Sequence, residues 1–437
     1  MDPLTIGYLG CILAVILMFL GMPVAYAFGL IGFVGTSLIN GWQSGFASVG
    51  LYPFRICSIS AYSVIPLFIF MGYVILFSGV GSEFFVLARK WIGHVRGGLA
   101  MTTVLSSAGF GAVSGDVVSA AVTMAAISLP ETRKHKYADR LIIGSIAGGA
   151  NLSFIIPPSL GFILFGAITS TSIGQLFIAG IIPGIMITLL FLALISFLCK
   201  RHPEWGAGLE RASWKERLIA FKSGWVVITT FILVIGGIYF GVFTPTEAAA
   251  AGSAFVLIIS LLRKNLDWEG LKKALVETGL TTGMIMLILF CCMIFSLFLA
   301  LSGVAGVLES FLLSLKVSRY IILAITLIVY VFIGLFMDVL AMILVTLPFI
   351  FPIIVNGLGF DPIFFGVVVI LAMIMGHISP PFGIVIYSLK ATPICNDIPL
   401  FQLFRAALPF LGVMTLSIFI IILFPELATY LPAIMMK

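Results

Sequence analysis

Two short polar interruptions, VSGDVV at 113–118 and LFMDVL at 335–340, each break a long apolar run of the chain. Each is followed by a second break that contains a proline pair, IIPPSLG at 155–161 and ISPPFG at 378–383. The two aspartates lie 222 positions apart, and so do a proline of IIPPSLG and a proline of ISPPFG. A constant spacing between such unusual residues predicts that the chain contains one unit twice.

Other residues that punctuate helices share this spacing. It joins Pro23 with Pro245, Pro130 with Pro352, and Asp139 with Asp361. Several such residues in one order at one spacing favour a duplication. The alternative is that helix-ending residues arose independently at similar places.

The composition places both units in a membrane. Of the 437 residues, 61% are hydrophobic and 9% are charged. A soluble domain carries about 25% charged residues, so a soluble globule is excluded. Disordered, coiled-coil and nucleic-acid-binding chains are excluded too, because there is no polar tract, heptad block or basic stripe. The apolar residues suffice for about ten membrane helices of roughly 20 residues each. The six cysteines lack metal-binding spacing and are interpreted as reduced packing residues. No cleavable signal is expected at the first apolar run, which lacks a basic leader.

Each predicted repeat contains the same series of segments. In the first repeat, 1–198, we expect scaffold helices at 4–80, an amphipathic arm at 81–96, a hairpin at 98–130, a broken helix at 138–168 and a last helix at 174–198. A charged linker follows at 199–222. In the second repeat, 223–437, we expect scaffold helices at 223–301, an arm at 303–319, a hairpin at 320–352, a broken helix at 363–389 and a last helix at 402–425.

The two hairpin segments are too short to cross a membrane twice. Two full crossings need roughly 40 residues and a turn. We therefore expect re-entrant hairpins, whose unpaired backbone must line a cavity inside the protein. About five crossings remain in each repeat, and an odd number inverts the second repeat relative to the first. The sequence thus predicts an all-α polytopic membrane protein with two inverted-topology repeats.

The basic residues indicate how the chain is oriented. If the N-terminus lies outside, all but four of the 23 Lys and Arg residues fall in cytoplasmic segments, among them the linker at 199–222. The four exceptions are Arg55, Lys316, Arg319 and Lys437. Because short cytoplasmic loops are enriched in basic residues, we expect both termini in the periplasm. The net charge of +6 is interpreted as this loop bias.

The breaks are the candidate functional site. A broken helix leaves N–H and C=O groups unpaired at low dielectric, where N-terminal ends attract anions and C-terminal carbonyls coordinate cations. Inverted repeats with helices broken near the midplane are typical of secondary transporters. Polar and small residues gather at four breaks: Ser114, Gly115, Asp116 and Ser119 at the first hairpin tip; Gly148, Gly149, Asn151, Ser153, Pro157, Pro158 and Ser159 in the first broken helix; Gly334, Met337 and Asp338 at the second tip; and Gly376, His377, Ser379, Pro380, Pro381 and Gly383 in the second broken helix.

Each side chain at the breaks also has a structural interpretation. A carboxylate inside a membrane is costly, so Asp116 and Asp338 are candidate Na⁺ ligands or proton carriers. Alternatively, they only cap half-helices. The serines and Asn151 are alternatively side chains that hydrogen-bond the preceding helical turn. His377 is interpreted as either a packing histidine or a proton relay.

Two further features are interpreted as structural. Thr244, Pro245 and Glu247 form a capping-box pattern at the start of a helix, which assigns Glu247 to capping. The stretches 42–62 and 81–96 are amphipathic and rich in aromatic residues. Interfacial helices are the first expectation for such stretches, and a subunit interface is the alternative.

Together the motifs resemble one transporter family. FTPTEAAAAG at 243–252, IPPSLGFILFGAITSTSIGQLFIAGIIPG at 156–184, LFMDVL and ISPPFG resemble the large membrane subunit of tripartite ATP-independent periplasmic (TRAP) transporters. The resemblance covers essentially the whole chain. It implies a Na⁺-coupled secondary importer of an organic anion of the carboxylate or sialic acid class, working by an elevator mechanism in the bacterial inner membrane. It also implies two partners, a small four-helix membrane subunit and a periplasmic substrate-binding protein.

The resemblance also implies a division of the site. Two cation sites, with Na⁺ and no transition metal or organic cofactor, would involve Ser114, Gly115, Asp116, Ser119, Gly148, Gly149, Asn151, Gly334, Met337, Asp338, Gly376 and Ser379. The substrate would lie between them, near Asn151, Ser153, Pro157, Pro158, Ser159, Pro380, Pro381 and Gly383. The shift from Ser-rich tips toward Asp116 leaves open which ligands are side chains and which are carbonyls.

Three other functions compete with this interpretation. A stand-alone cation-coupled anion symporter of the wider ion-transporter group would need no binding protein. An intramembrane enzyme would use Asp116, Asp338 or His377, but no catalytic partner or HExxH-like spacing accompanies them. A purely structural membrane subunit leaves the paired broken helices unexplained. We therefore expect a transporter and not an enzyme.

Overall fold

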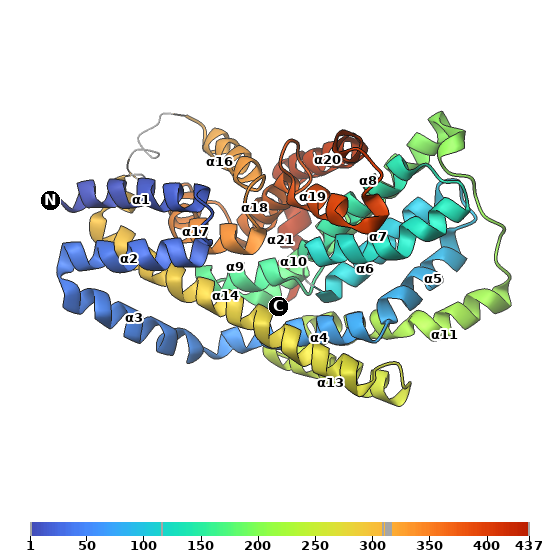
Figure 1. The fold of residues 1–437 in the computed structure, drawn as a ribbon, viewed down its shortest axis with the longest axis horizontal. Coiled ribbons are helices and arrows are strands. Elements are labelled where there is room, and N and C mark those ends of the chain that lie inside the picture. Colours follow the sequence, from blue (N-terminus) through green and yellow to red (C-terminus); the bar gives the residue numbers. More distant parts are fainter. Residues whose placement is uncertain (1, 115–116, 308–309, 311–316, 436–437) are drawn as a thin grey trace.

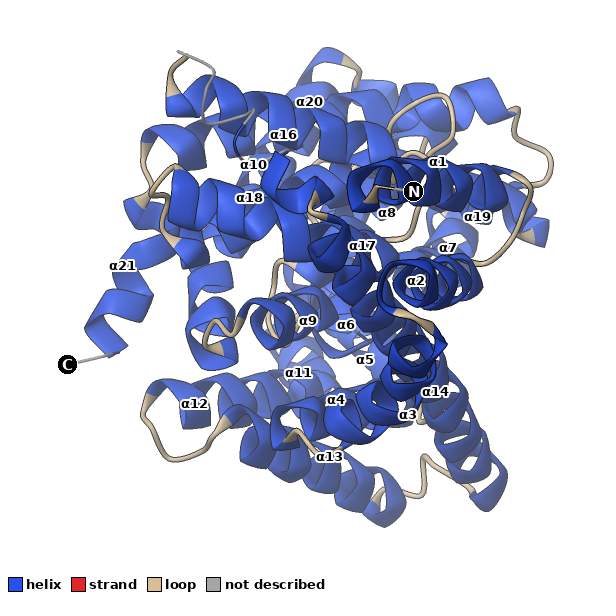
Figure 2. Cartoon of the chain, turned by 90° about the vertical axis from the view of Figure 1, so that its left-hand side faces the viewer, coloured by secondary structure: helices blue, strands red, loops and turns tan. Residues whose placement is uncertain are grey.

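The computed structural model describes residues 2–114, 117–307, 310 and 317–435 (Figure 1). Every regular element within these residues is helical, and they contain no strand (Figure 2). The first half contains α1 (Pro3–Phe19), α2 (Val24–Asn40), α3 (Trp42–Cys57), α4 (Val64–Phe77), α5 (Val80–Ile92), α6 (Gly98–Ser114), α7 (Val117–Lys134), α8 (Asp139–Asn151), α9 (Leu160–Thr169) and α10 (Ile173–Arg201). The second half contains α11 (Trp214–Phe231), α12 (Gly237–Tyr239), α13 (Pro245–Leu262), α14 (Trp268–Ser302), α16 (Arg319–Ile333), α17 (Val339–Phe351), α18 (Pro362–Gly376), α19 (Ile384–Ala391), α20 (Leu400–Leu423) and α21 (Glu426–Met435). The predicted all-α class is confirmed.

Several of the described helices can cross a membrane. Five are long and apolar enough, namely α10, α13, α14, α20 and α17 with its π-helical continuation to Gly357. The number rises to seven if each of two bent helix pairs counts as one span. The continuation of α17 runs past the expected end of the second hairpin at 352. The chain is a multi-pass membrane protein, as the composition predicts.

The first amphipathic arm follows a sharp bend. Helices α4 and α5 meet at 68°, and Gly79 between them has φ +73, in the left-handed region that favours glycine. Helix α5 occupies most of the predicted arm at 81–96. Of the second predicted arm, at 303–319, residues 308–309 and 311–316 lie outside the described residues.

The segment between the two halves is shorter than the expected linker at 199–222. Helix α10 extends to Arg201, and α11 already begins at Trp214. The early start has a local cause, because Ser213 and Glu216 form a capping box at the N-terminus of α11. Only residues 202–213 connect the two helices.

The first halves of the two broken helices, α8 and α18, lie in the interior of the protein. Every residue of α18 from Phe364 to Gly376 is buried, and so is every residue of α8 from Leu141 to Asn151. A helix that is apolar all round belongs in a core. Helix α18 packs against α10, α16 and α20, while α8 packs against α6, α7 and α20. In Figure 1, α4, α11 and α13 run along the lower edge, and α14 crosses the molecule beside α2.

Ion pairs gather in segments that the charge pattern predicts to be cytoplasmic. Arg89 pairs with Glu131, and Arg263 pairs with Glu83 at 2.9 Å. Burial would raise the pKa of the Glu131 carboxyl, but Arg89 and neighbouring cations outweigh burial and hold this pKa below its usual value. Glu131 is therefore ionised at neutral pH.

Candidate functional site

The second hairpin tip is built around a capped half-helix. Helix α16 ends at Ile333 and α17 begins at Val339. Asp338 is the N-cap of α17, and its Oδ2 accepts a hydrogen bond from the Leu340 N–H at 2.9 Å. The capping role that the sequence left open for Asp338 is therefore present.

This tip is held tightly against the second broken helix. A Cβ on Gly376 would lie 2.5 Å from the Gly334 carbonyl carbon, and a Cβ on Gly334 would lie 2.6 Å from the Met373 carbonyl oxygen. Only glycine permits this backbone approach. The Nε2 of His377, which is fully buried, lies 3.3 Å from the Met337 carbonyl oxygen, so its N–H can donate there. Met337, Gly376 and His377 thus fix the turn that presents Asp338.

Part of the first tip lies outside the described residues. This applies to Gly115, Asp116 and the side chain of Ser114. Ser119, in the first turn of α7, is described and half-buried.

The first broken helix presents two different faces. Gly149 faces α6, where a Cβ would lie 2.8 Å from the Cβ of Ser107, and Ser153 lies against Gly111 of the same helix. Gly148 instead faces Phe410 of α20, and Asn151 Nδ2 lies 3.7 Å from the Met414 sulfur of that helix. The structure therefore brings Gly149 and Ser153, but not the Asn151 amide, toward the first hairpin.

Three predicted site serines make local backbone hydrogen bonds. Ser153 donates to Ala150 O at 2.6 Å, Ser159 donates to Phe154 O at 2.8 Å and caps α9, and Ser379 donates to Met375 O at 2.7 Å. This is the structural role that the sequence left open for them. Each oxygen keeps a lone pair after donating its hydrogen.

The two proline breaks differ in exposure. Both Pro157–Pro158 and Pro380–Pro381 contain a cis peptide bond. Pro157 and Pro158 are buried, whereas Pro380 and Pro381 are exposed. Gly383 is buried, and a Cβ there would lie 2.6 Å from the His377 carbonyl oxygen.

One cavity lies between the two hairpins and the scaffold helices α4 and α14. It has a volume of about 260 Å³ and contains Ser119 from α7 and Asp338 from the second tip in its lining. The remaining lining residues come from α6, α9 and α17 on one side and from α4 and α14 on the other. They are Phe110, Leu160 and Leu340, and Ile69, Gly72, Tyr73, Leu76, Thr281 and Met284. Residues that are far apart in sequence, from the first and the second half of the chain, therefore line one cavity.

Sequence reasoning missed the polar wall of this cavity. The Tyr73 hydroxyl lies 2.9 Å from the Thr281 hydroxyl and links α4 to α14. A hydroxyl in each of two apolar helices was the available signal, but similar residues occur throughout the chain. Ser106 and Ser107 of α6 were also missed, and their buried hydroxyls have no hydrogen-bond partner among the described residues.

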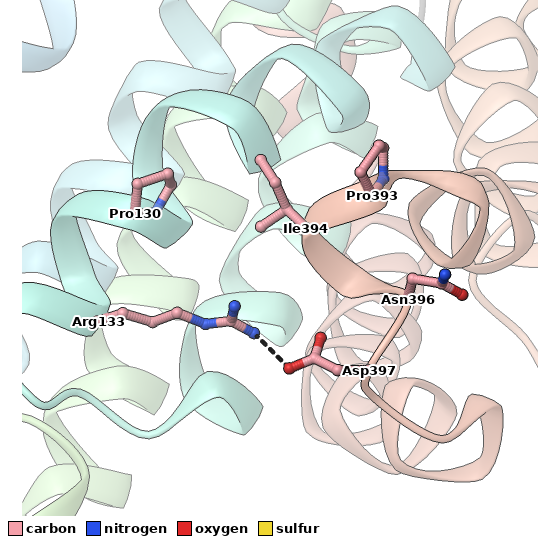
Figure 3. A pocket seen from close by; sticks show the side chains of 6 residues that line it. All are labelled: Pro130, Arg133, Pro393, Ile394, Asn396 and Asp397. Atoms are coloured by element: carbon pink, nitrogen blue, oxygen red, sulfur yellow. Dashed lines mark hydrogen bonds and ion pairs between the residues drawn. The ribbon is translucent and has the colours of Figure 1, made fainter.

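A larger cavity lies at the charged end of α7. It has a volume of about 550 Å³ and is lined by Pro130, Arg133, Pro393, Ile394, Asn396 and Asp397 (Figure 3). Arg133 pairs with Asp139 at 2.7 Å and with Asp397 at 3.5 Å. The hydrogen bonds that Arg133 donates to the Asp139 carboxylate raise the pKa of Arg133, so this side chain stays a cation. None of the residues predicted for the site lines this cavity.

The described residues contain no group of three His, Cys, Asp or Glu side chains that could hold a metal ion.

Comparisons with known proteins identify the family. Residues 11–427 match the family described as "Tripartite ATP-independent periplasmic transporter, DctM component". The chain is 28% identical to the sialic acid TRAP transporter large permease protein SiaM of Vibrio cholerae, over 98% of this chain and 97% of that protein. It is 32% identical to the C4-dicarboxylate TRAP transporter large permease protein DctM of Pseudomonas aeruginosa, over 85% of this chain and 84% of that protein. The fold is similar to that of the Alcanivorax borkumensis YdaH transporter, with a TM-score of 0.59 and 14% identity over 90% of this chain and 88% of that one.

The resemblance seen in the sequence motifs is thereby confirmed. The match extends through the hairpins, both broken helices and the scaffold. The chain belongs to the DctM-component family, the large membrane subunits of tripartite ATP-independent periplasmic transporters.

Proposed function

We propose that this subunit carries out Na⁺-coupled import of an organic anion of the carboxylate or sialic acid class. It would act in the bacterial inner membrane with a small four-helix membrane subunit and a periplasmic protein that delivers the substrate. The observation that carries the proposal is the cavity where Ser119 and Asp338 from the two hairpins meet Tyr73 and Thr281.

The cation is proposed to bind at the hairpin tips. Asp338 supplies a carboxylate at the start of α17, and the ends of α16 and α18 supply carbonyl groups beside it. Half-helix C-terminal ends favour cations, and a hard ion such as Na⁺ prefers oxygen ligands. By the predicted repeat, the first tip with Gly149, which of Gly148, Gly149 and Asn151 is the residue that faces α6, would provide a second Na⁺ site.

The substrate is proposed to bind in the cavity between the tips and the scaffold. The cavity lining contains no Lys or Arg among the described residues. The N–H groups at the start of α9 and α17, together with bound Na⁺, would therefore have to balance an anionic group. Leu160 of α9 and Leu340 of α17 place both helix starts at the cavity.

The transport step is proposed to be an elevator movement of the interrupted elements against the scaffold. The contact of Gly334 with Gly376 and the His377 hydrogen bond join the second tip to α18, so these elements can move together. Helices α4 and α14 form the opposite wall of the cavity. A boundary at the substrate cavity is what alternating access requires.

Uptake by proteoliposomes tests this function. The chain would be reconstituted with its small membrane subunit, and the binding protein would be loaded with radiolabelled sialic acid or a C4-dicarboxylate. We expect uptake only with an inward Na⁺ gradient and only with the binding protein present. Equal uptake under a K⁺ gradient would contradict the coupling, whereas uptake by this chain alone would assign it to the stand-alone symporters.

A further inference from the structure

A third cavity lies between the scaffold arm and the first hairpin. It has a volume of about 460 Å³ and lies between α5, α6 and α11. Its walls are apolar, with Leu87 and Trp91 on α5, Leu105 and Ala108 on α6, and Phe221 and Phe231 on α11. The cavity contains none of the residues predicted for the transport site.

A buried cation stands beside this cavity. Arg217 lies one turn before Phe221 on α11 and is only 5% exposed. Its guanidinium carbon is 5.7 Å from the centre of the Trp91 ring, which lines the cavity, and 5.2 Å from the centre of the Trp214 ring. The arginine therefore extends along the tryptophan at the cavity wall.

Among the residues that the structure describes, no carboxylate is seen to pair with this guanidinium. Its Nε and Nη2 are buried and have no hydrogen-bond partner among the described residues. Burying a charged group without hydrogen bonds is strongly unfavourable, and contact with an aromatic face offsets only part of that penalty. An anion that accepts hydrogen bonds from these two nitrogen groups would remove this penalty.

The neighbouring carboxylates are already engaged. Glu216 pairs with Lys90 at 2.9 Å and accepts the Ser213 N–H at 2.8 Å. Glu83 of α5, the helix that carries Trp91, pairs with Arg263 at 2.9 Å. The surroundings of Arg217 therefore favour an anion from outside the chain.

We propose that an anionic phospholipid binds here, with its phosphate on Arg217 and one acyl chain in the apolar cavity. The Nε and Nη2 groups form one edge of the guanidinium, and this edge can donate two parallel hydrogen bonds to phosphate oxygens. An apolar cavity whose wall residue Trp91 also contacts a buried cation matches an amphipathic ligand. The lipid fills the space between α5 and α6, so it joins the arm to the hairpin. This site is separate from the transport site and does not depend on the substrate.

Native mass spectrometry of the purified, delipidated chain tests the proposal. The chain would be titrated with dioleoyl phosphatidylglycerol, with dioleoylglycerol, which has the same chains without phosphate, and with inorganic phosphate. We expect phosphatidylglycerol to bind one per chain, and the other two ligands to bind at least about tenfold more weakly. Equal binding of dioleoylglycerol, or displacement of the lipid by millimolar phosphate, would overturn the proposal.

Variants locate the site. Arg217→Gln should weaken phosphatidylglycerol binding about tenfold, whereas Arg211→Gln, at an exposed arginine of the preceding segment, should leave it unchanged. Ala88→Phe, which fills the cavity from α5, should weaken lipid binding while Arg217 stays in place. If Arg217→Gln does not fold, lipid binding by Ala88→Phe and the comparison of the three ligands still test the proposal. If Ala88→Phe and a correctly folded Arg217→Gln both bind phosphatidylglycerol as well as the wild type does, the proposal is overturned. Displacement of the lipid by the small membrane subunit would overturn it too.

Discussion

At the residue scale, Asp338 serves two purposes that substitutions can separate. It caps α17 through the Leu340 N–H, and it lines the cavity shared by the two hairpins. Asparagine caps a helix about as well as aspartate does, but it carries no charge. Substitution by asparagine therefore removes the charge proposed for cation binding and keeps the cap of α17.

We predict that Asp338→Asn abolishes Na⁺-dependent uptake but leaves thermal stability close to that of the wild type. Asp338→Ala should lose uptake and also about 1 kcal/mol of stability, because its cap is removed. Uptake in proteoliposomes and thermal unfolding in detergent measure the two effects. Asp361→Asn is the matched control, since Asp361 caps α18 at an exposed position. Wild-type uptake by Asp338→Asn would remove the Asp338 charge from the cation site.

Single residues could be predicted from sequence where their partner is local. The Thr244–Glu247 capping box is present as expected, because both partners lie within one turn. The hydroxyl pair of Tyr73 and Thr281 could not be predicted, because it joins residues 208 positions apart. No local pattern specifies such a pair, and only the fold brings it together.

At the element scale, the helix breaks were the most predictable features. Proline lacks an N–H and restricts the residue before it, and the pairs Pro157–Pro158 and Pro380–Pro381 lie at helix breaks. Single prolines did not give the same signal, because Pro130, Pro183 and Pro409 lie inside α7, α10 and α20.

Helix α11 begins inside the predicted linker, because Ser213 and Glu216 form a capping box in a charged stretch that resembled a linker. The cap there was a better signal than the charge. The bend of 61° between Trp214–Lys222 and Gly224–Tyr239 falls where the first span of the second repeat was expected.

The packing of the second tip on α18 gives a prediction at this scale. Gly376→Ala should lower stability by about 1–3 kcal/mol, because the new Cβ would lie 2.5 Å from the Gly334 backbone. Gly279→Ala is the control on α14, where a Cβ meets no atom within 4 Å. This control should be neutral or raise stability by about 0.5–1 kcal/mol. Thermal unfolding of both variants measures the difference, and equal stability would show that the tip does not need this close approach.

At the scale of the whole molecule, the pattern of charge and hydropathy was sufficient to predict an all-helical membrane protein. The family membership agrees with the motifs that suggested it. The inverted relation of the two halves stays a prediction, and it rests on the 222-residue spacing and on the basic residues. The cavity at Ser119 and Asp338 could not be placed from sequence, because it depends on how hairpins from both halves pack against α4 and α14.

The predicted orientation can be tested with reporter fusions. Alkaline phosphatase, which is active only in the periplasm, would be fused after Lys437 or inserted at Gly208 in the segment between the halves. We expect activity only from the fusion after Lys437, because the charge pattern puts the C-terminus outside and the central segment inside. Activity at both positions, or only at Gly208, would contradict the predicted topology.

The most direct test of the central claim is the binding of ²²Na⁺ to the purified chain, which needs no knowledge of the substrate. The cation sites proposed at the hairpin tips predict saturable ²²Na⁺ binding that unlabelled Na⁺ displaces and K⁺ does not. Asp338→Asn should bind less ²²Na⁺ at saturation, whereas Asp361→Asn should bind as much as the wild type. Absence of saturable binding, or equal displacement by K⁺, would contradict the account.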